Sequence, residues 1–295
     1  MHLRQLQYLE ALSREAHFGR AADACHVSQP ALSNGIAKLE EELGLALVRR
    51  GRQFEGLTPE GRAVLEWARA ALASVDGLEQ EAARLREGLA GTIRIGVIPT
   101  ANGRLGQVLG PFMHEQPAVR LEIVTAPTTQ IVDQLARREL DAGLVYTDDP
   151  LPGAAPLAIA PLYRERLLLL TSDTRWRASH GTVTWAEAAT VPLCLLAPSM
   201  QNRQVIDRAF RAAGVSDVQV RAEADSIVAL MELGSAGSSC IVADAWLDGR
   251  ALPHGVRVHG LASPTVSPTV GLVTAQGPLV SPTVLALRER LAAAA

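Results

Sequence analysis

The sequence predicts an α+β protein with several domains: a small helical domain with a short β-hairpin, one long helix, and a two-lobed α/β unit. Three patterns support this fold class. Residues 20–42 have the spacing of two short helices joined by a tight turn. A helical pattern then runs from Pro59 to about Gly88. From Thr92 onward, apolar strand-like runs alternate with helical stretches, as in α/β domains.

Composition suits a folded protein of two or three domains. The chain has 295 residues, of which 48% are hydrophobic and 20% charged, which is ordinary for a globular protein. It contains no run of about 18 uninterrupted apolar residues, and residues 1–15 are amphipathic and charged. We therefore expect neither a membrane-spanning helix nor a secretory signal, and we expect a cytoplasmic location.

Residues 20–42 predict a helix-turn-helix. Small residues at Ala21, Ala22 and Ala24 would let the first helix approach the second closely. Ser28 is a favourable N-cap for the second helix, because its hydroxyl can accept from a free amide of the first turn, and Pro30 lies where its missing donor costs nothing. Apolar residues then recur at steps of four and three, at Leu32, Ile36, Leu39 and Leu43.

The other face of this second helix is polar and would read DNA. It presents Gln29, Ser33, Asn34 and Lys38. The alternative is a helical hairpin inside a larger core. A buried helix, however, has little use for these polar side chains on one side.

Residues 47–57 predict a short β-wing with clustered arginines. The formal net charge of the chain is −3, so no strongly basic domain points to nucleic acid. Arg49, Arg50 and Arg52 nevertheless lie close together at the turn, and local placement matters more than the sum of charges. The alternative is a solvated basic loop.

The pattern AA..C.VSQPALS..I..LEEELG..L..R, followed by LTPEG, resembles the N-terminal signature of LysR-type transcriptional regulators. This resemblance covers the first ninety residues and implies a winged helix-turn-helix domain at 1–58 that binds double-stranded promoter DNA. The wing arginines would hold the sugar-phosphate backbone. Gly35 departs from the family pattern of a larger polar residue, and we expect it either to permit close approach to a phosphate or to remove one base contact. The expected DNA-binding residues are Ser28, Gln29, Pro30, Ser33, Asn34, Lys38, Arg50 and Arg52.

Residues 59–91 predict a linker helix and hinge that joins two copies of the chain. Apolar residues repeat at steps of four and three, which is the seam of a helix pair. The alternative is one amphipathic helix packed on its own domain, although about thirty helical residues exceed what a small winged domain can cover. By the family resemblance, effector lobes also pair, which gives a homotetramer. The seam comprises Val64, Ala68, Ala71, Val75, Leu78, Ala82, Leu85 and Leu89.

Residues 92–295 predict an effector-binding domain of two α/β lobes. The runs TIRIGVI, RLEIVTA and LDAGLVY read as strands of the first lobe, and LCLLA, VQVRAE and SCIVA as strands of the second. We expect lobe I to hold 92–170 and 263–295 and lobe II to hold 171–262, with crossovers near 171 and 262. This order of elements resembles the periplasmic-binding-protein-like plan of LysR-type effector domains.

Two predicted strands end in polar loops that start helices, and these loops are the candidate effector site. Helix N-termini attract anions, and ligands of open α/β sheets lie beyond the carboxyl ends of strands. Thr100 and Ser199 are the first candidates, and the alternative is that both are only N-caps of their own helices. The expected set, which the resemblance also supports, is Thr100, Ala101, Asn102, Thr128, Ser199, Met200, Gln201, Asn202 and Ile227.

A small carboxylate is the expected effector. Only 4% of the residues are aromatic, and they are scattered, so a large flat ligand would lack stacking partners. The N-terminal sequence resembles regulators that accompany formate or other short-acid metabolism, which makes formate one candidate.

The sequence favours neither an enzyme nor a cofactor or metal site. Lys38 is the sole lysine, so a phosphate-binding loop ending in GKS or GKT is absent, as are GxSxG and HExxH motifs. Cys25, Cys194 and Cys240 are too widely separated for a zinc site or a disulfide framework, and they read as core residues. Redox sensing, known in this family, is the alternative for the cysteines. The alternative function is a small-solute binding module without a transcriptional role.

Overall fold

The structure is a computed structural model that describes residues 1–50, 54–153, 156–174, 180–249, 251–252, 254–276 and 280–294. The chain forms two compact units. The first is built on Met1–Gly88 and the second begins at Leu89. Every helix among the described residues is too short or too polar to cross a membrane.

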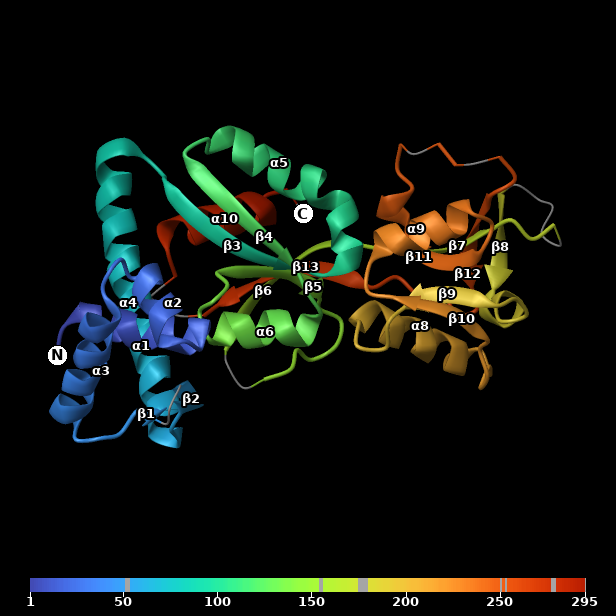
Figure 1. Ribbon diagram of the computed structural model, residues 1–295. Helices are drawn as coiled ribbons and strands as arrows, with labels where there is room; N and C mark the ends of the chain where they lie inside the picture. The colour runs from blue at the N-terminus through green and yellow to red at the C-terminus, as the bar shows by residue number, and fades with distance from the viewer. Residues whose placement is uncertain are drawn as a thin grey trace. The chain divides into compact units, whose positions relative to one another are not determined.

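The first unit is a winged helix-turn-helix domain extended by a long helix (Figure 1). Its core lies where α1, α2 and α3 meet, around the fully buried Leu9, Leu32 and Ile36. Strands β1 and β2 pair antiparallel as the wing. The elements are α1 (Leu3–Glu15), α2 (Phe18–Ala24), α3 (Gln29–Leu43), β1 (Val48–Arg50), β2 (Phe54–Leu57) and α4 (Pro59–Glu87).

The start of α3 is fixed by the residues that the sequence indicated, and its end by a glycine. The Ser28 hydroxyl accepts from the Ala31 amide at 3.4 Å, and Pro30 lies in the first turn. Gly44 ends the helix with a φ of 66°, a left-handed conformation that glycine adopts at little cost. The start of α3 is therefore set by local chemistry as well as by packing.

The seam on α4 divides into two parts. Near its start, Ala68 is buried in the domain's own core, where Val64 and Ala71 also pack. Further along, Leu78 and Leu85 are 69% and 72% exposed. Within the seam, the first part therefore serves its own domain, and the second part presents apolar side chains that a partner helix could cover. Trp67, outside the seam, is also 80% exposed.

The first lobe of the second unit is a five-stranded mixed sheet in the order β4-β3-β5-β13-β6. Strand β3 is parallel to β4 and β5, and β13 is antiparallel to β5 and β6. The strands are β3 (Gly91–Val97), β4 (Val119–Thr125), β5 (Ala142–Tyr146), β6 (Leu157–Arg164) and β13 (Thr269–Ala275). Its helices are η1 (Pro99–Arg104), α5 (Leu105–Glu115), α6 (Thr128–Ala136) and α10 (Pro282–Ala292).

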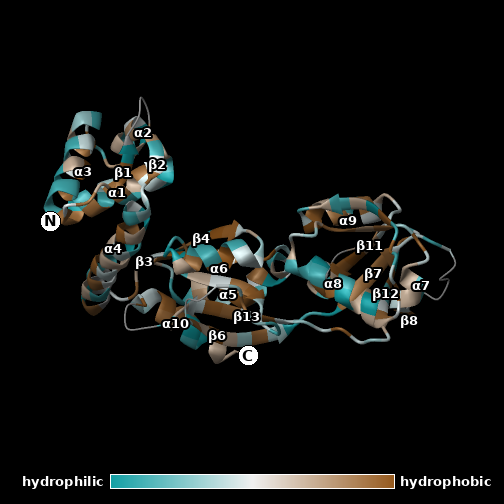
Figure 2. Ribbon diagram, turned by 90° about the horizontal axis from the view of Figure 1, so that it is seen from below, coloured by the Kyte–Doolittle hydropathy of each residue, from teal (hydrophilic) through white to brown (hydrophobic). Residues whose placement is uncertain are grey.

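The second lobe is a six-stranded sheet in the order β10-β9-β11-β7-β12-β8. Its central strands β7 and β11 are hydrophobic, whereas α8 on the outside carries many hydrophilic residues (Figure 2). The strands are β7 (Leu167–Thr171), β8 (His180–Thr184), β9 (Leu193–Leu196), β10 (Val220–Ala224), β11 (Ser239–Ala243) and β12 (Arg257–Ala262). Its helices are α7 (Trp185–Ala188), α8 (Gln201–Ala212), α9 (Ile227–Ser235) and η2 (Asp244–Trp246).

The first crossover between the lobes lies earlier than the sequence suggested. Strand β7 pairs with β11 and β12 and so belongs to the second lobe. The crossover is therefore Glu165–Arg166 rather than a segment near 171.

Strands β6, β8 and β12 were not predicted as strands. In β6, Pro161 and mixed exposure obscure the alternation, and both are tolerated because β6 is an edge strand.

Gly35 has a structural reason that differs from both expectations. A Cβ at this position would lie 2.5 Å from Cδ2 and 2.7 Å from Cε2 of the Tyr8 ring. Gly35 therefore faces α1, where it makes room for that ring. It is a packing residue between α1 and α3.

Gly35→Ala is expected to destabilise the first unit. Helix propensity alone would favour Ala by about 1 kcal/mol, but displacing the Tyr8 ring from a packed position costs about 1–3 kcal/mol. The control is Gly77→Ala in α4, where an added Cβ meets nothing within 4 Å, so stability should rise. Urea unfolding of both full-length variants measures the two effects. A stability gain in both would show that the Tyr8 contact does not constrain residue 35.

Candidate functional site

The outer face of α3 is the candidate DNA-reading surface. Gln29, Asn34 and Lys38 are exposed and Ser33 is half-buried, whereas the apolar residues between them are buried. Ser28 and Pro30 are exposed at the helix start. The residues expected to read bases therefore lie together on one accessible face, with the helix N-terminus at one end.

The wing is tied to α3 by a glutamate. Glu40 Oε1 accepts from the amides of Leu47 and Val48 at 2.8 and 3.0 Å. The Arg49 guanidinium donates to the Glu55 carbonyl within the wing at 3.0 Å. Of Arg50 only the backbone is described, and Arg52 lies outside the described residues. The contribution of these two arginines stays a prediction.

A buried hydroxyl joins the two lobes of the second unit. Tyr146, at the end of β5, donates to Glu165 Oε2 at 2.5 Å. Thr100 Oγ1 lies 3.0 Å from the same hydroxyl, and Asn202 Nδ2 of α8 donates to it at 3.2 Å. Since a phenol has one hydrogen, which Glu165 takes, the Thr100 hydroxyl must donate to Tyr146. Lobe I, the crossover and lobe II thus share one oxygen atom.

Two further contacts bridge the lobes. Thr128 of α6 donates to Gln201 Oε1 of α8 at 2.5 Å. Trp246 Nε1 of η2 donates to the Thr100 carbonyl at 2.8 Å. The helical turns η1 and η2 approach closely because Gly103 has no side chain: a Cβ there would lie 3.1 Å from the Ala245 Cβ and from Trp246 Cδ1.

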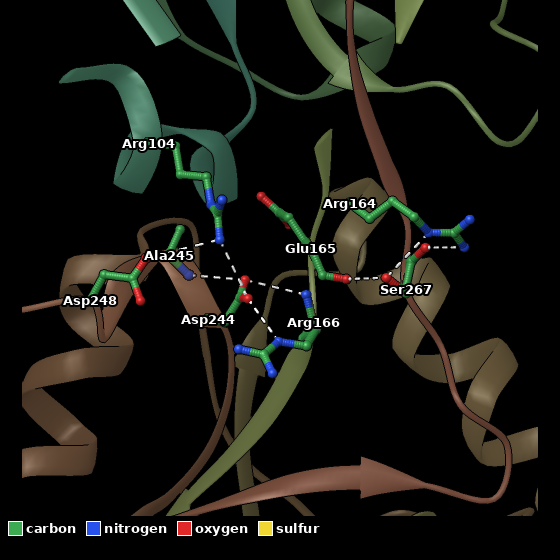
Figure 3. A network of polar contacts seen from close by, with 8 residues as sticks. All are labelled: Arg104, Arg164, Glu165, Arg166, Asp244, Ala245, Asp248 and Ser267. Carbon is green, nitrogen blue, oxygen red and sulfur yellow. Dashed lines mark hydrogen bonds and ion pairs between the residues drawn. The ribbon is translucent and has the colours of Figure 1, made fainter. Parts of the chain in front are cut away.

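An ion network lies at the crossover, on both sides of which Figure 3 shows charged side chains. The Asp244 carboxylate pairs with Arg104 of η1 at 3.4 Å and with Arg166 at 3.1 Å. The amides of Arg166 and Ala245 also donate to Asp244 Oδ1. Asp244 and Arg104 are largely shielded from solvent, so their ion pair is less screened than that of the exposed Arg166, and together these bonds hold η1, η2 and the crossover.

The predicted effector residues fall into two groups. Thr100, Thr128, Gln201 and Asn202 meet between the lobes. The others do not join them: Ala101 is buried, Met200 and Ile227 pack in the core of the second lobe, Asn102 bonds to Thr125, and Ser199 is exposed. The N-cap positions are Ile98 and Met200, so neither Thr100 nor Ser199 is the cap of its helix.

Sequence reasoning missed Tyr146, Glu165, Trp246 and Asp244. Tyr146 is a polar residue at the carboxyl end of an apolar strand, which is a usual position for a ligand contact. Glu165 is a lone acid in the connection between two apolar strands. Both signals were present in the sequence, but neither shows which partner lies across the lobes.

Glu165 makes the inter-lobe cluster electrostatically unusual. Its side chain has no exposed surface, and burial raises its pKa from about 4.5 to about 7, although the Tyr146 hydrogen bond acts to lower it. Within the described part of the chain, Glu165 Oε1 and Asn202 Oδ1 are buried without a hydrogen-bond partner. A buried polar atom left unpaired typically costs about 1–3 kcal/mol.

This carboxyl weighs against the expected small-carboxylate effector. A carboxylate among Thr100, Thr128 and Asn202 would share the cluster with Glu165, and like charges repel strongly where water is excluded. The expectation therefore gains no support from the residues that meet here.

The cysteines lie outside this cluster. Cys194 and Cys240 are buried at facing positions of β9 and β11. Burial, together with Cys194, raises the pKa of Cys240 to about 12, and burial raises the pKa of Cys25. Among the residues that the structure describes, no group of three or more His, Cys, Asp or Glu side chains could hold a metal ion.

A winged helix-turn-helix followed by a two-lobed α/β unit defines a DNA-binding regulator with an effector-binding domain. The bacterial regulatory helix-turn-helix model of the lysR family matches residues 3–62, and the LysR substrate binding domain matches residues 86–295. The chain belongs to the LysR family of transcriptional regulators, which are transcription factors rather than enzymes. Because members of this family bind DNA, the alternative function from the sequence, a small-solute binding module without a transcriptional role, is not supported.

Known relatives extend over nearly the whole chain. It is 32% identical to the DNA-binding transcriptional dual regulator OxyR of Escherichia coli over 94% of this chain and 90% of that protein. It is 32% identical to the HTH-type transcriptional regulator IlvR of Caulobacter vibrioides, over 92% of each. A full-length OxyR variant from Pseudomonas aeruginosa has a TM-score of 0.78 and 28% identity, covering 100% of this chain and 94% of that one.

A DNA complex shows the same fold. The structure of full-length CbnR with its target DNA has a TM-score of 0.68 and 22% identity, covering 99% of each chain. The names of these relatives do not mention formate, so they give no support to formate as the effector.

Glu165→Gln is expected to change the pH dependence of stability. Because the pKa of Glu165 is higher in the folded than in the unfolded chain, its stabilising contribution is complete below about pH 4.5 and is lost as the pH rises to about 7. A shift of this size corresponds to about 3 kcal/mol. Above pH 7 the neutral glutamine should therefore give the more stable protein, and near pH 4.5 the difference should vanish. Urea unfolding followed by tryptophan fluorescence across this range measures it, and parallel curves for both proteins would contradict it.

Proposed function

We propose that this regulator reads promoter DNA with the outer face of α3 and that a small effector at the inter-lobe cluster sets its DNA-binding geometry. The observation that carries the proposal is the sharing of the Tyr146 hydroxyl by Thr100, Glu165 and Asn202. A ligand that replaces these hydrogen bonds with its own changes how one lobe is held against the other. If it binds one arrangement of the lobes more tightly than another, it shifts the equilibrium between the two arrangements. Coupling of this kind is typically about 1–3 kcal/mol, or roughly 5- to 150-fold in occupancy.

The proposed location is the cytoplasm, where promoter DNA lies. A small carboxylate remains a prediction of the sequence for the effector, and Glu165 weighs against it.

A peroxide response is the alternative that the names of several relatives raise, since they are called hydrogen peroxide-inducible genes activators, including one of Haemophilus influenzae at 30% identity. Thiol oxidation requires a reactive thiolate. The two buried cysteines and the raised pKa of Cys25 and Cys240 do not supply one. We therefore do not extend a thiol-based peroxide response to this chain.

The DNA contact is tested by separating base reading from backbone binding. Ser33→Ala and Asn34→Ala should each lose discrimination at defined base pairs, by about 1–3 kcal/mol per good contact. Arg50→Ala should weaken all sequences alike and reduce the salt dependence. Gln7→Ala, an exposed polar change on α1, is the control. Footprinting and anisotropy at several salt concentrations measure these effects, and an identical loss at every position in all three variants would refute the division.

Dimerisation through the later part of α4 is tested by charging its exposed leucines. Leu78→Asp combined with Leu85→Asp should dissociate the dimer and lower operator affinity more than about tenfold, because two apolar contacts are replaced by like charges. Asp76→Asn changes an exposed charge on the opposite side of α4 and should leave assembly intact. Sedimentation that shows unchanged assembly in the double variant would remove this seam. Pairing of effector lobes into a tetramer is the accompanying proposal.

A further inference from the structure

After the hydrogen bonds between the lobes are made, two buried acceptor atoms of the shared cluster remain unpaired. The Tyr146 hydrogen goes to Glu165 Oε2, and the Thr100 hydroxyl and the Asn202 amide group both donate to Tyr146. The atoms that remain without a partner are Glu165 Oε1 and Asn202 Oδ1, and both belong to side chains that are at least nine-tenths buried. A group that completes this cluster must therefore donate hydrogen bonds.

The assignment of the Asn202 amide follows from the same count. If its oxygen faced Tyr146, that hydroxyl would have to donate a second hydrogen, which it does not have. The amide nitrogen must face Tyr146, so Oδ1 is the free atom. Glu165 comes from the crossover and Asn202 from the second lobe, so one donor group that reaches both would bridge the crossover and lobe II.

The charged side chains nearest to Glu165 are Arg104 and Asp244, whose opposite charges act on its pKa in opposite directions. The nearest arginines, Arg104 and Arg166, bond to Asp244, and the Arg164 side chain extends in the opposite direction from that of Glu165 (Figure 3). Thr100, Tyr146 and Asn202 are neutral. The Glu165 carboxyl accepts from the neutral Tyr146 phenol, and the neutral Thr100 hydroxyl also acts to lower its pKa. A bound cation would further stabilise its ionised form.

A metal ion fits these atoms less well than an organic cation. Among the described residues, no group of three or more His, Cys, Asp or Glu side chains gathers at any point, and Ca²⁺ or Mg²⁺ would require several oxygen ligands. One carboxylate and one amide oxygen suit a group with two or three N–H donors.

From these observations we propose that the effector of this chain is a small cation of the amine or ammonium class, held by Glu165 Oε1 and Asn202 Oδ1. This inference rests on the proposed function, because it names the ligand of the same inter-lobe cluster.

The inference also predicts the direction in which the affinity for the cation changes with pH. A cation requires ionised Glu165, whose pKa is about 7, so affinity should fall as the pH drops below 7, by up to about tenfold per pH unit. An acid that binds protonated Glu165 would show the opposite sign.

The experiment uses the full chain and methylammonium chloride as the probe, with sodium formate, sodium acetate and sodium chloride at equal ionic strength for comparison. Thermal unfolding and calorimetry are recorded at pH 6 and pH 8. Methylammonium should raise the unfolding temperature and bind more tightly at pH 8, whereas the two carboxylates should match sodium chloride. Glu165→Gln and Asn202→Leu should each lose the methylammonium effect. Glu232→Gln removes an exposed carboxyl of the second lobe and should keep it.

Several results would overturn the inference. One is that formate or acetate binds and methylammonium does not, and another is that methylammonium binds more tightly at pH 6 than at pH 8. The others are an unchanged methylammonium response in Glu165→Gln and no methylammonium effect on the wild-type protein up to about 100 mM. Operator binding by the same preparations, measured without any probe, separates the two proposals. Wild-type protein that fails to bind its operator would refute the proposed function, while the probe measurements would still decide the ligand class. Circular dichroism confirms that each variant is folded.

Discussion

The arrangement of the effector unit depends on the single hydroxyl of Tyr146. Residues 100, 146, 165 and 202 are far apart in sequence and belong to both lobes and to the crossover between them, yet their side chains meet at this oxygen. A buried phenol can donate once and accept twice, and here all three capacities are used. The position of α8 relative to β5 is therefore set by hydrogen-bond stoichiometry as well as by apolar packing. Removing Glu165 would leave the Tyr146 hydrogen without its acceptor, and removing Thr100 or Asn202 would leave one lone pair of the phenol oxygen unused.

The helix-turn-helix could be read from the sequence because its determinants are local. Ser28 caps the helix that it precedes, and the steps between Leu32, Ile36 and Leu39 define the face that is buried. Such features involve residues within one or two helical turns. The reason for Gly35 was not readable in the same way, since Tyr8, the residue that requires it, lies on another helix.

The inter-lobe cluster could be predicted only in part for the same physical reason. Polar residues at strand ends indicated Thr100, Thr128 and Asn202, because the carboxyl ends of strands are where ligands meet a sheet. Ser199 follows a strand as well, but its side chain is exposed. Glu165 resembles any surface acid in sequence, and only the three-dimensional structure shows that its carboxyl is buried beside Tyr146. The first crossover was misplaced because β7 is as apolar as the strands of the first lobe.

The close approach of η1 and η2 has a consequence for how such a regulator can diversify. These turns can approach closely because residue 103 is glycine, and a side chain at this position would push η1 and η2 apart. Gly103 has no side chain with which to bond a ligand. Substitutions at this one codon would thus change the resting angle between the lobes while the side chains that bond the ligand keep their chemical identity. The balance between lobe arrangements can then change through a residue that does not itself bond the ligand.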